Sequence, residues 1–223
     1  MTAYWANKAH GLHRVRSEDW LQKYAEEILA IIPRRGVLFD VGCGACEVTS
    51  YLAPHFDKIY GIDFSDSMLQ AAHQRIDRLG IANIDLLKGT MTKFPQNDRR
   101  PHVILSYAVI QYLVPAEFIG HLRACRSVLE RDGVVFVGLV PDPARKQLFY
   151  ARLFPDRSNL RRRIDIYRYQ IAQYFKNDPI LDGMGNWYSP SDIKRFAGEA
   201  GFETEIHKPR YADYRFHAVL RLR

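Results

Sequence analysis

The chain has 223 residues, of which 47% are hydrophobic and 26% are charged, as in globular proteins that bury a core. No apolar run approaches the roughly 18 residues that a membrane span needs, so we expect no membrane partner. The N-terminal residues have no apolar signal core, and the three cysteines fit free thiols in a reducing compartment. We therefore expect a cytoplasmic protein.

Residues 1–33 are expected to form an N-terminal helical cap. Residues 1–16 are aromatic and basic, with little periodicity. Ser17 and the two acids after it are typical of a helix start, apolar side chains follow at helical spacing, and Pro33 ends the helix. The aromatic side chains before this helix either cover a binding site or pack against an edge of a sheet.

A glycine-containing turn at residues 37–46 organises the predicted fold. A short apolar strand carries Asp40, and Gly42 and Gly44 follow it before residues that can form a helix. In an open α/β sheet, such a turn lies at the carboxyl end of a strand, where ligands bind. A dinucleotide site would need a third glycine where this chain has Glu47, and that carboxylate would repel a pyrophosphate.

Apolar strands and helices alternate from this turn to residue 140, which predicts an α/β fold. After the first strand we expect strands at 58–63, 84–89, 102–107 and 134–140, and helices at 47–53, 67–79 and 118–129. Asp63 ends the second strand about 20 residues after the turn, where a carboxylate can accept hydrogen bonds from ribose hydroxyls. Gly80 provides a left-handed stop for the helix that comes next.

Residues 141–188 interrupt the alternation, and residues 143–176 within them carry a charge equal to the whole positive excess of the chain. The formal net charge is +7, and residues 143–176 alone have nine Lys or Arg against two Asp. Aromatic side chains are interleaved among the arginines, and we expect a helical insertion. Ser189 then caps a helix with Pro190 in its first turn. Strands at about 203–208 and 215–221 are expected to complete the sheet as an antiparallel pair.

Three segments resemble motifs of the class I S-adenosylmethionine-dependent methyltransferases. Residues 40–44, Asp-Val-Gly-Cys-Gly, are similar to the first motif of that family. Residues 61–69 follow its second motif, Gly-Ile-Asp-x-Ser-x-x-Met-Leu, and residues 108–113 resemble the segment after its fourth strand. The resemblance implies a doubly wound, Rossmann-like, seven-stranded sheet with six parallel strands, one antiparallel strand and a helical insertion after strand five. It also implies one methyltransferase domain over residues 1–223.

The resemblance implies that the cofactor is S-adenosylmethionine, with S-adenosylhomocysteine as the product. Two positions depart from the family: Cys46 stands where a third glycine is usual, and Thr90 stands where an Asp commonly accepts from the adenine amino group. Backbone groups of Thr90 and Met91 could still contact the adenine edge. The implied cofactor-binding residues are Asp40, Gly42, Cys43, Gly44, Asp63, Phe64, Met68, Thr90, Met91, Ser106, Tyr107 and Gln111.

We expect the acceptor to be a small, anionic metabolite that is methylated on oxygen or nitrogen. Arginine suits carboxylate and phosphate groups, and residues 141–188 would form a lid over the acceptor. In the family, a helical N-terminal extension often covers the cofactor as well. The candidate substrate-binding residues are Tyr4, His13, Tyr112, Arg145, Tyr150, Arg152, Arg168 and Trp187. A solvated basic helix that serves solubility or a dimer contact is the alternative interpretation of the insertion.

No spacing in the sequence singles out a catalytic base, and no metal is expected. Some quinone O-methyltransferases of the family have a metal-binding glutamate where this chain has Gln111. The pair Cys43 and Cys46 lies inside the glycine turn and has no second Cys-x-x-C partner.

Two other functions remain compatible with the sequence. The basic, aromatic insertion could follow a nucleic-acid backbone while it stacks bases, as in an RNA-modifying methyltransferase. No recognised RNA-binding module accompanies it, so a nucleic-acid partner is disfavoured. A non-catalytic, methyltransferase-like protein would explain Cys46 and Thr90, although Asp63 and both principal glycines are retained. Monomer and homodimer both fit the sequence.

Overall fold

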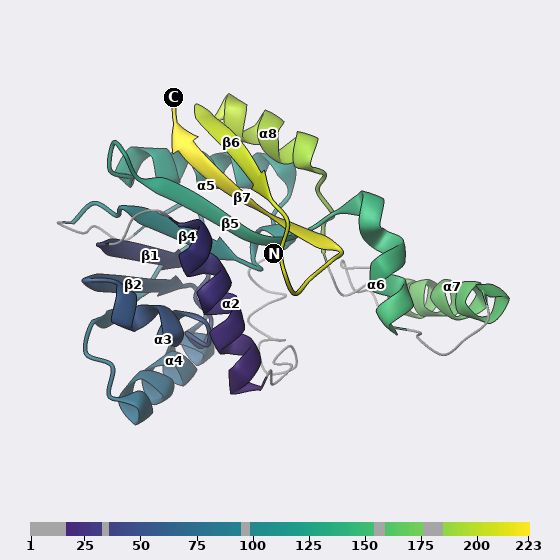
Figure 1. The fold of residues 1–223 in the computed structure, drawn as a ribbon, viewed down its shortest axis with the longest axis horizontal. Coiled ribbons are helices and arrows are strands. Elements are labelled where there is room, and N and C mark those ends of the chain that lie inside the picture. Colours follow the sequence, from purple (N-terminus) through teal and green to yellow (C-terminus); the bar gives the residue numbers. More distant parts are fainter. Residues whose placement is uncertain (1–16, 33–35, 95–98, 154–158, 176–184) are drawn as a thin grey trace.

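The computed structural model describes residues 17–32, 36–94, 99–153, 159–175 and 185–223. Within them, seven strands form one sheet in the order β3-β2-β1-β4-β5-β7-β6 (Figure 1). The strands are β1 (Val37–Val41), β2 (Lys58–Asp63), β3 (Ile84–Lys88), β4 (Val103–Tyr107), β5 (Val134–Pro141), β6 (Phe202–His207) and β7 (Arg215–Leu222). All pairings are parallel except those of β7, which runs antiparallel to β5 and to β6. The predicted fold class is thereby confirmed.

The burial of each strand follows its place in the sheet. Every residue of β1 and of β5 is buried, because helices cover both faces of these central strands. In β3, at the edge, Ile84 alone is buried. Burial therefore increases from the edge strand β3 to the central strands β1 and β5.

Helices lie on both faces of the sheet. The described helices are α2 (Glu18–Ile31), α3 (Thr49–Leu52), α4 (Asp66–Leu79), α5 (Pro115–Val128), α6 (Lys146–Leu153), α7 (Asn159–Phe175) and α8 (Pro190–Glu199), with 3-10 turns η2 (Ala53–His55), η3 (Ile110–Tyr112) and η4 (Pro143–Arg145); all but α6 and α7 pack on the sheet. One core packs α5 and α8 against one face through side chains such as Phe118 and Phe196. The second core packs α2, α3 and α4 against the other face through Ile28, Leu52 and Ile76.

Gly80 and Ser189 cap helices as predicted, whereas Ser17 precedes α2 without a side-chain capping hydrogen bond, and two helix bounds differ from prediction. The Ser65 hydroxyl accepts from the Met68 N–H at the start of α4, and Gly80 ends that helix with φ +64°. The helix expected at 47–53 is a single turn, α3, that continues into η2. The helix expected from residue 118 begins at Pro115, because proline suits a first turn and the Glu117 carboxylate accepts from the preceding backbone N–H.

Helix α2 is fixed to β7, at the opposite end of the chain. Glu27 is 3% exposed and accepts from the backbone N–H of Arg210. Its other carboxylate oxygen lies 3.6 Å from Nε2 of His217 in β7. Nδ1 of that histidine accepts from the Leu139 N–H at 3.1 Å, where a bulge interrupts the pairing of β5. These contacts join the first described helix, the centre of the sheet and the last strand.

The segment between β5 and α8 contains α6 and α7, which extend away from the sheet (Figure 1). Four rings attach α6 to the body of the protein, and we call them the aromatic cluster: Phe149, Tyr150, Trp187 and Tyr214. The ring centroid of Phe149 lies 5.3 Å from that of Tyr214 and 5.7 Å from that of Trp187. None of the described helices is both long and apolar enough to cross a membrane.

Candidate active site

A cavity of about 540 Å³ opens at the carboxyl ends of β1, β2, β3 and β4. This is the edge at which ligands bind in open α/β sheets. The lining residues are Val41, Gly42, Gly44, Glu47, Ile62, Asp63, Phe64, Ser65, Met68, Gly89, Thr90, Met91, Thr92, Tyr107, Ala108, Val109, Tyr112, Leu113 and Glu117. Its walls are mostly apolar, with carboxylates at separate positions around it.

The glycine turn forms one wall of this cavity. Gly42 has φ +81° and Gly44 has φ +54°, both in the left-handed region that favours glycine. A Cβ on Gly42 would lie 2.7 Å from Cγ2 of Val109, so this position also needs glycine for space. A Cβ on Gly44 would meet no atom within 4 Å, because it would point into the cavity.

Asp63 joins the turn to the end of β2. One carboxylate oxygen accepts from the Gly44 N–H at 2.9 Å, and the other accepts from the Ser65 N–H at 2.9 Å. Burial raises the pKa of Asp63, and these backbone hydrogen bonds oppose the rise. A carboxylate has about four lone-pair sites, so each oxygen keeps acceptor capacity toward the cavity that the residue lines.

Asp40 lies beneath the turn and does not line the cavity. Its carboxylate accepts from the Thr49 hydroxyl of α3. Burial raises the pKa of Asp40 to about 7, the hydrogen bond from Thr49 opposes this rise, and the negative charge of Asp63 adds to it. The side chain therefore supports the turn from within the protein.

The two cysteines of the turn are buried free thiols behind the cavity wall. An added Cβ on Gly61 of β2 would lie 3.2 Å from the Cys43 sulfur and 3.3 Å from the Cys46 sulfur, so the glycine makes room for both. Cys46 has φ +54°, the conformation for which a glycine is usual at this position. Among the described residues, no group of three or more His, Cys, Asp or Glu could hold a metal ion.

The segments after β2 and β3 form another wall. Phe64 and Met68 follow β2, Thr90 and Met91 follow β3, and all four line the cavity. The Thr90 hydroxyl accepts from the Lys93 N–H at 3.2 Å, which closes the loop on itself. Thr90 thus provides local structure at the position where the family has a carboxylate.

Three residues expected from the segment after β4 have different surroundings. Tyr107 lines the cavity. Ser106 is fully buried, and its hydroxyl lies 2.9 Å from Nε2 of His121 in α5. Gln111 is buried too, and its amide oxygen accepts from the Arg215 guanidinium at 3.0 Å. Ser106 and Gln111 therefore lie behind the wall rather than in it.

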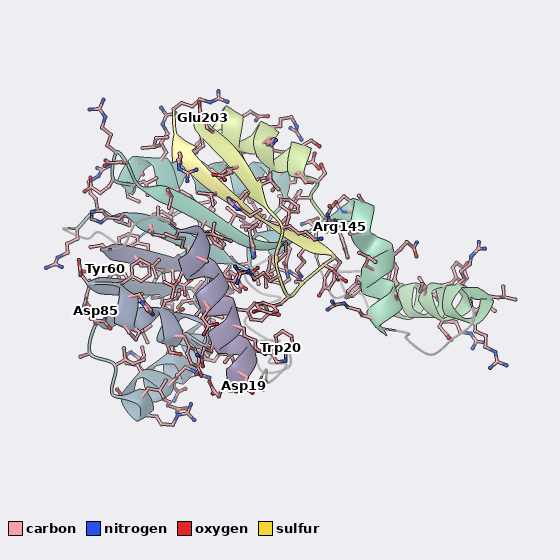
Figure 2. The ribbon with its side chains drawn as sticks, viewed as in Figure 1. Asp19, Trp20, Tyr60, Asp85, Arg145 and Glu203 are labelled. Carbon is pink, nitrogen blue, oxygen red and sulfur yellow. The ribbon has the colours of Figure 1, made fainter. Side chains whose placement is uncertain are left out.

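Of the candidate substrate-binding residues, Tyr112 lines the cavity. Arg145, which Figure 2 shows where β5 passes into α6, donates to the Asp213 carbonyl at 2.8 Å and contacts Asp142 at 3.5 Å. Arg152 pairs with the Asp213 carboxylate at 3.2 Å.

The remaining candidates lie in the insertion or outside the described ranges. Tyr150 and Trp187 belong to the aromatic cluster, and Arg168 is exposed on α7. Tyr4 and His13 lie outside the residues that the structure describes.

Several lining residues were not predicted from the sequence. Ala108 has φ +57°, which turns the chain after β4 so that Val109 and Leu113 also reach the cavity. Glu117 lines it as well, although its pattern in the sequence is that of a helix-capping acid. A positive φ at alanine has no sequence signal, so this wall could not be assigned in detail.

The fold of the chain is shared with known methyltransferases. Residues 38–133 match the family model of a methyltransferase domain. The chain is 33% identical over 102 residues to a trans-aconitate 2-methyltransferase of Methylobacterium radiotolerans, a match that spans 44% of this chain and 37% of that protein. It is 24% identical over 199 residues to an uncharacterized methyltransferase of Bacillus pumilus, across 88% of this chain and 83% of that one.

Solved structures show the same fold. The CcbJ methyltransferase of Streptomyces caelestis superposes with a TM-score of 0.64 at 17% identity, over 98% of this chain and 96% of that one. A complex of DhpI with S-adenosylhomocysteine superposes with a TM-score of 0.65 at 16% identity, over 99% and 94%. The methyltransferase domain that the motifs predicted is thus matched over residues 38–133, and the whole chain has the fold of solved methyltransferases, one of which contains S-adenosylhomocysteine, the product of the expected cofactor.

Proposed function

We propose that the protein transfers the methyl group of S-adenosylmethionine to an oxygen or nitrogen atom of a small-molecule acceptor. The observation that carries this proposal is the cavity at the carboxyl ends of the strands, with Gly44 and Asp63 in one wall and Tyr107 and Tyr112 in another. The cofactor supplies a methyl group already activated on a sulfonium. The protein has to bind the two reactants, align them and exclude water.

The lining residues suit each part of the cofactor. We propose that the Asp63 carboxylate accepts from ribose hydroxyls and that Phe64 and Met68 contact the adenine ring, because all three residues line the cavity. The open space above Gly44 lets the methionine part approach the backbone closely. The acceptor would then enter from the side of Tyr112, where Tyr107 and its neighbours form the wall.

The end of the insertion supports its proposed role as an acceptor lid. The Asn186 N–H donates to the Gln111 carbonyl at 2.7 Å, and its side-chain amide donates to the Leu113 carbonyl at 2.9 Å. The Tyr188 hydroxyl donates to the same Leu113 carbonyl at 2.5 Å. Leu113 and Tyr112 line the cavity, so a movement of the insertion would displace residues of the acceptor wall.

An anionic acceptor is proposed on the composition of the insertion. The trans-aconitate 2-methyltransferase named above acts on a small carboxylate, which agrees with this proposal. Neither Arg145 nor Arg152 lines the cavity, since both engage Asp213. We therefore propose that the insertion attracts an anion by its field over a distance, while the groups that hold the acceptor are uncharged.

Two measurements test the proposed function. Calorimetry should first show binding of S-adenosylhomocysteine to the purified chain, and the absence of binding would favour a non-catalytic protein. Transfer of a labelled methyl group should then be followed with a panel of small carboxylic acids, phenols and amines, and with bulk tRNA as the nucleic-acid arm. Label in the tRNA and in no small molecule would support the RNA-modifying alternative and contradict the proposal.

A further inference from the structure

A fully buried histidine, His121, connects α5 to the loop that follows β3. Its Nδ1 lies 2.6 Å from the Met91 carbonyl oxygen, and its Nε2 lies 2.9 Å from the Ser106 hydroxyl. The ring packs between Phe94, at 6.1 Å between centroids, and Phe118, at 6.4 Å. It lies behind the cavity wall, which Met91 forms, and it is not among the lining residues.

These two hydrogen bonds define the tautomer of the ring. A carbonyl oxygen only accepts, so Nδ1 of His121 must carry the hydrogen and donate it to Met91. Nε2 is then the acceptor, and the Ser106 hydroxyl donates to it. Burial lowers the pKa of His121 to about 4, although the hydrogen bond to Met91 opposes the shift, so the ring is neutral near pH 7.

The direction of the Met91 carbonyl determines the direction of the next N–H. In a planar trans peptide the C=O of one residue and the N–H of the next point in opposite directions. The hydrogen bond holds the Met91 C=O toward the ring of His121 in α5. The N–H of Thr92 therefore points away from His121, and Thr92 itself lines the cavity.

We propose that His121 is a positioning residue that makes the cofactor site selective for adenine. By fixing the peptide between Met91 and Thr92, it presents an N–H donor to the base. This inference rests on the cofactor placement proposed above, with the adenine against Phe64 and Met68 and its edge toward the loop that contains Met91 and Thr92.

The selectivity follows from the chemistry of the base edge. N1 of adenine carries no hydrogen, so it can accept a hydrogen bond from the Thr92 N–H. N1 of hypoxanthine carries a hydrogen, so two donors would face each other and repel. Thr90 offers no carboxylate at the position where the family commonly reads the adenine amino group. Discrimination at this edge therefore depends on the backbone donor, and hence on the side chain that orients it.

The test compares two ligands that differ only at the base, S-adenosylhomocysteine and S-inosylhomocysteine, by calorimetry. We expect the native protein to bind the adenine ligand roughly ten-fold more tightly, the effect of one hydrogen bond replaced by a repulsive contact. His121→Phe keeps a ring but has no donor, so the peptide can turn and offer its carbonyl group. In that variant the ratio of the two dissociation constants should fall to within about two-fold.

Two further variants separate positioning from a loss of folding. His121→Asn keeps an amide N–H at the place of Nδ1 and should restore most of the preference. His102→Phe is the matched control, because Nδ1 of His102 accepts from the Val37 N–H at 3.3 Å at the other end of the strands. This control should leave the ratio unchanged.

Three outcomes would overturn the inference. One is an unchanged ratio in a folded His121→Phe protein, and a second is a native protein that binds both ligands equally. The third concerns the tautomer of His121, which nitrogen NMR of the imidazole measures in the native protein. This measurement remains available if the phenylalanine variant does not fold. A hydrogen on Nε2 of His121 would exclude the proposed bond to Met91. Failure of the native protein to bind either ligand would instead overturn the cofactor placement.

Discussion

The backbone N–H of Gly44 donates to the carboxylate of Asp63 at 2.9 Å, and this bond joins the turn after β1 to the end of β2. The two residues are 19 positions apart in the chain, and both line the cavity. The same carboxylate that we assign to the ribose thus also holds the turn on which the methionine part would lie. Loss of the side chain should disturb both.

Asp63→Ala should weaken S-adenosylhomocysteine binding by roughly 1–3 kcal/mol, because ribose hydroxyls would remain unpaired in a largely apolar site. Calorimetry measures the change directly. Asp66→Ala is the matched control, since Asp66 is exposed in the next helix and pairs with Lys88 outside the cavity. Equal affinities for the native protein and the Asp63 variant would remove Asp63 from the site.

Gly44→Ala should lower cofactor affinity at least ten-fold, because the new Cβ would occupy space that the ligand needs. Gly80→Ala provides a close comparison: both glycines have a left-handed φ, and neither has an atom within 4 Å of an added Cβ. Each variant should lose about 1 kcal/mol of unfolding free energy. If both variants bind S-adenosylhomocysteine normally, Gly44 serves chain geometry alone.

The free energy of unfolding should depend on pH through Asp40. Its pKa rises from 3.8 to about 7 in the folded protein, so the folded state binds the proton more tightly than the unfolded state does. This contribution to stability is complete below about pH 4 and is lost as the pH rises through about 7. The stability of the native protein relative to Asp40→Asn should therefore fall by a few kcal/mol over this range. Denaturant titrations at several pH values that give a constant difference would contradict the expectation.

Neutralising the arginines of the insertion should raise the KM for an anionic acceptor at low ionic strength without changing cofactor affinity. Arg145→Gln, Arg152→Gln and Arg168→Gln are to be made one at a time. Because none of the three lines the cavity, their effect should decline as salt is added, as expected for a field that acts over a distance. KM values that are the same as for the native protein at every salt concentration would make the charge a surface feature.

The glycine turn and Asp63 could be predicted because a local pattern determines them. A strand followed by spaced glycines has few backbone solutions, and an acid at the next strand end must reach the same edge of the sheet. Ser106 shows where such reasoning stops. Its position at the end of β4 was correct, but side chains alternate along a strand, and this one faces His121 in α5.

The insertion was less predictable for a different reason. Its composition indicated helices, and α6 and α7 are helices. The direction in which they leave the sheet depends on contacts between residues distant in sequence, such as Phe149 with Tyr214. Arg152 and Asp213, which form an ion pair, are likewise separated by 61 positions, and no pattern in either segment predicts their pairing.

The position of β7 between β5 and β6 has a consequence for synthesis of the chain on the ribosome. β5 is made long before β7, and its eight residues are all buried in the finished sheet. Until β7 emerges, one edge of β5 has unpaired backbone groups and β6 has no strand to pair with. Glu27 of α2 also lacks its contact with His217 during this time. The nascent protein should therefore stay vulnerable to association with other strands until its last strand has been released.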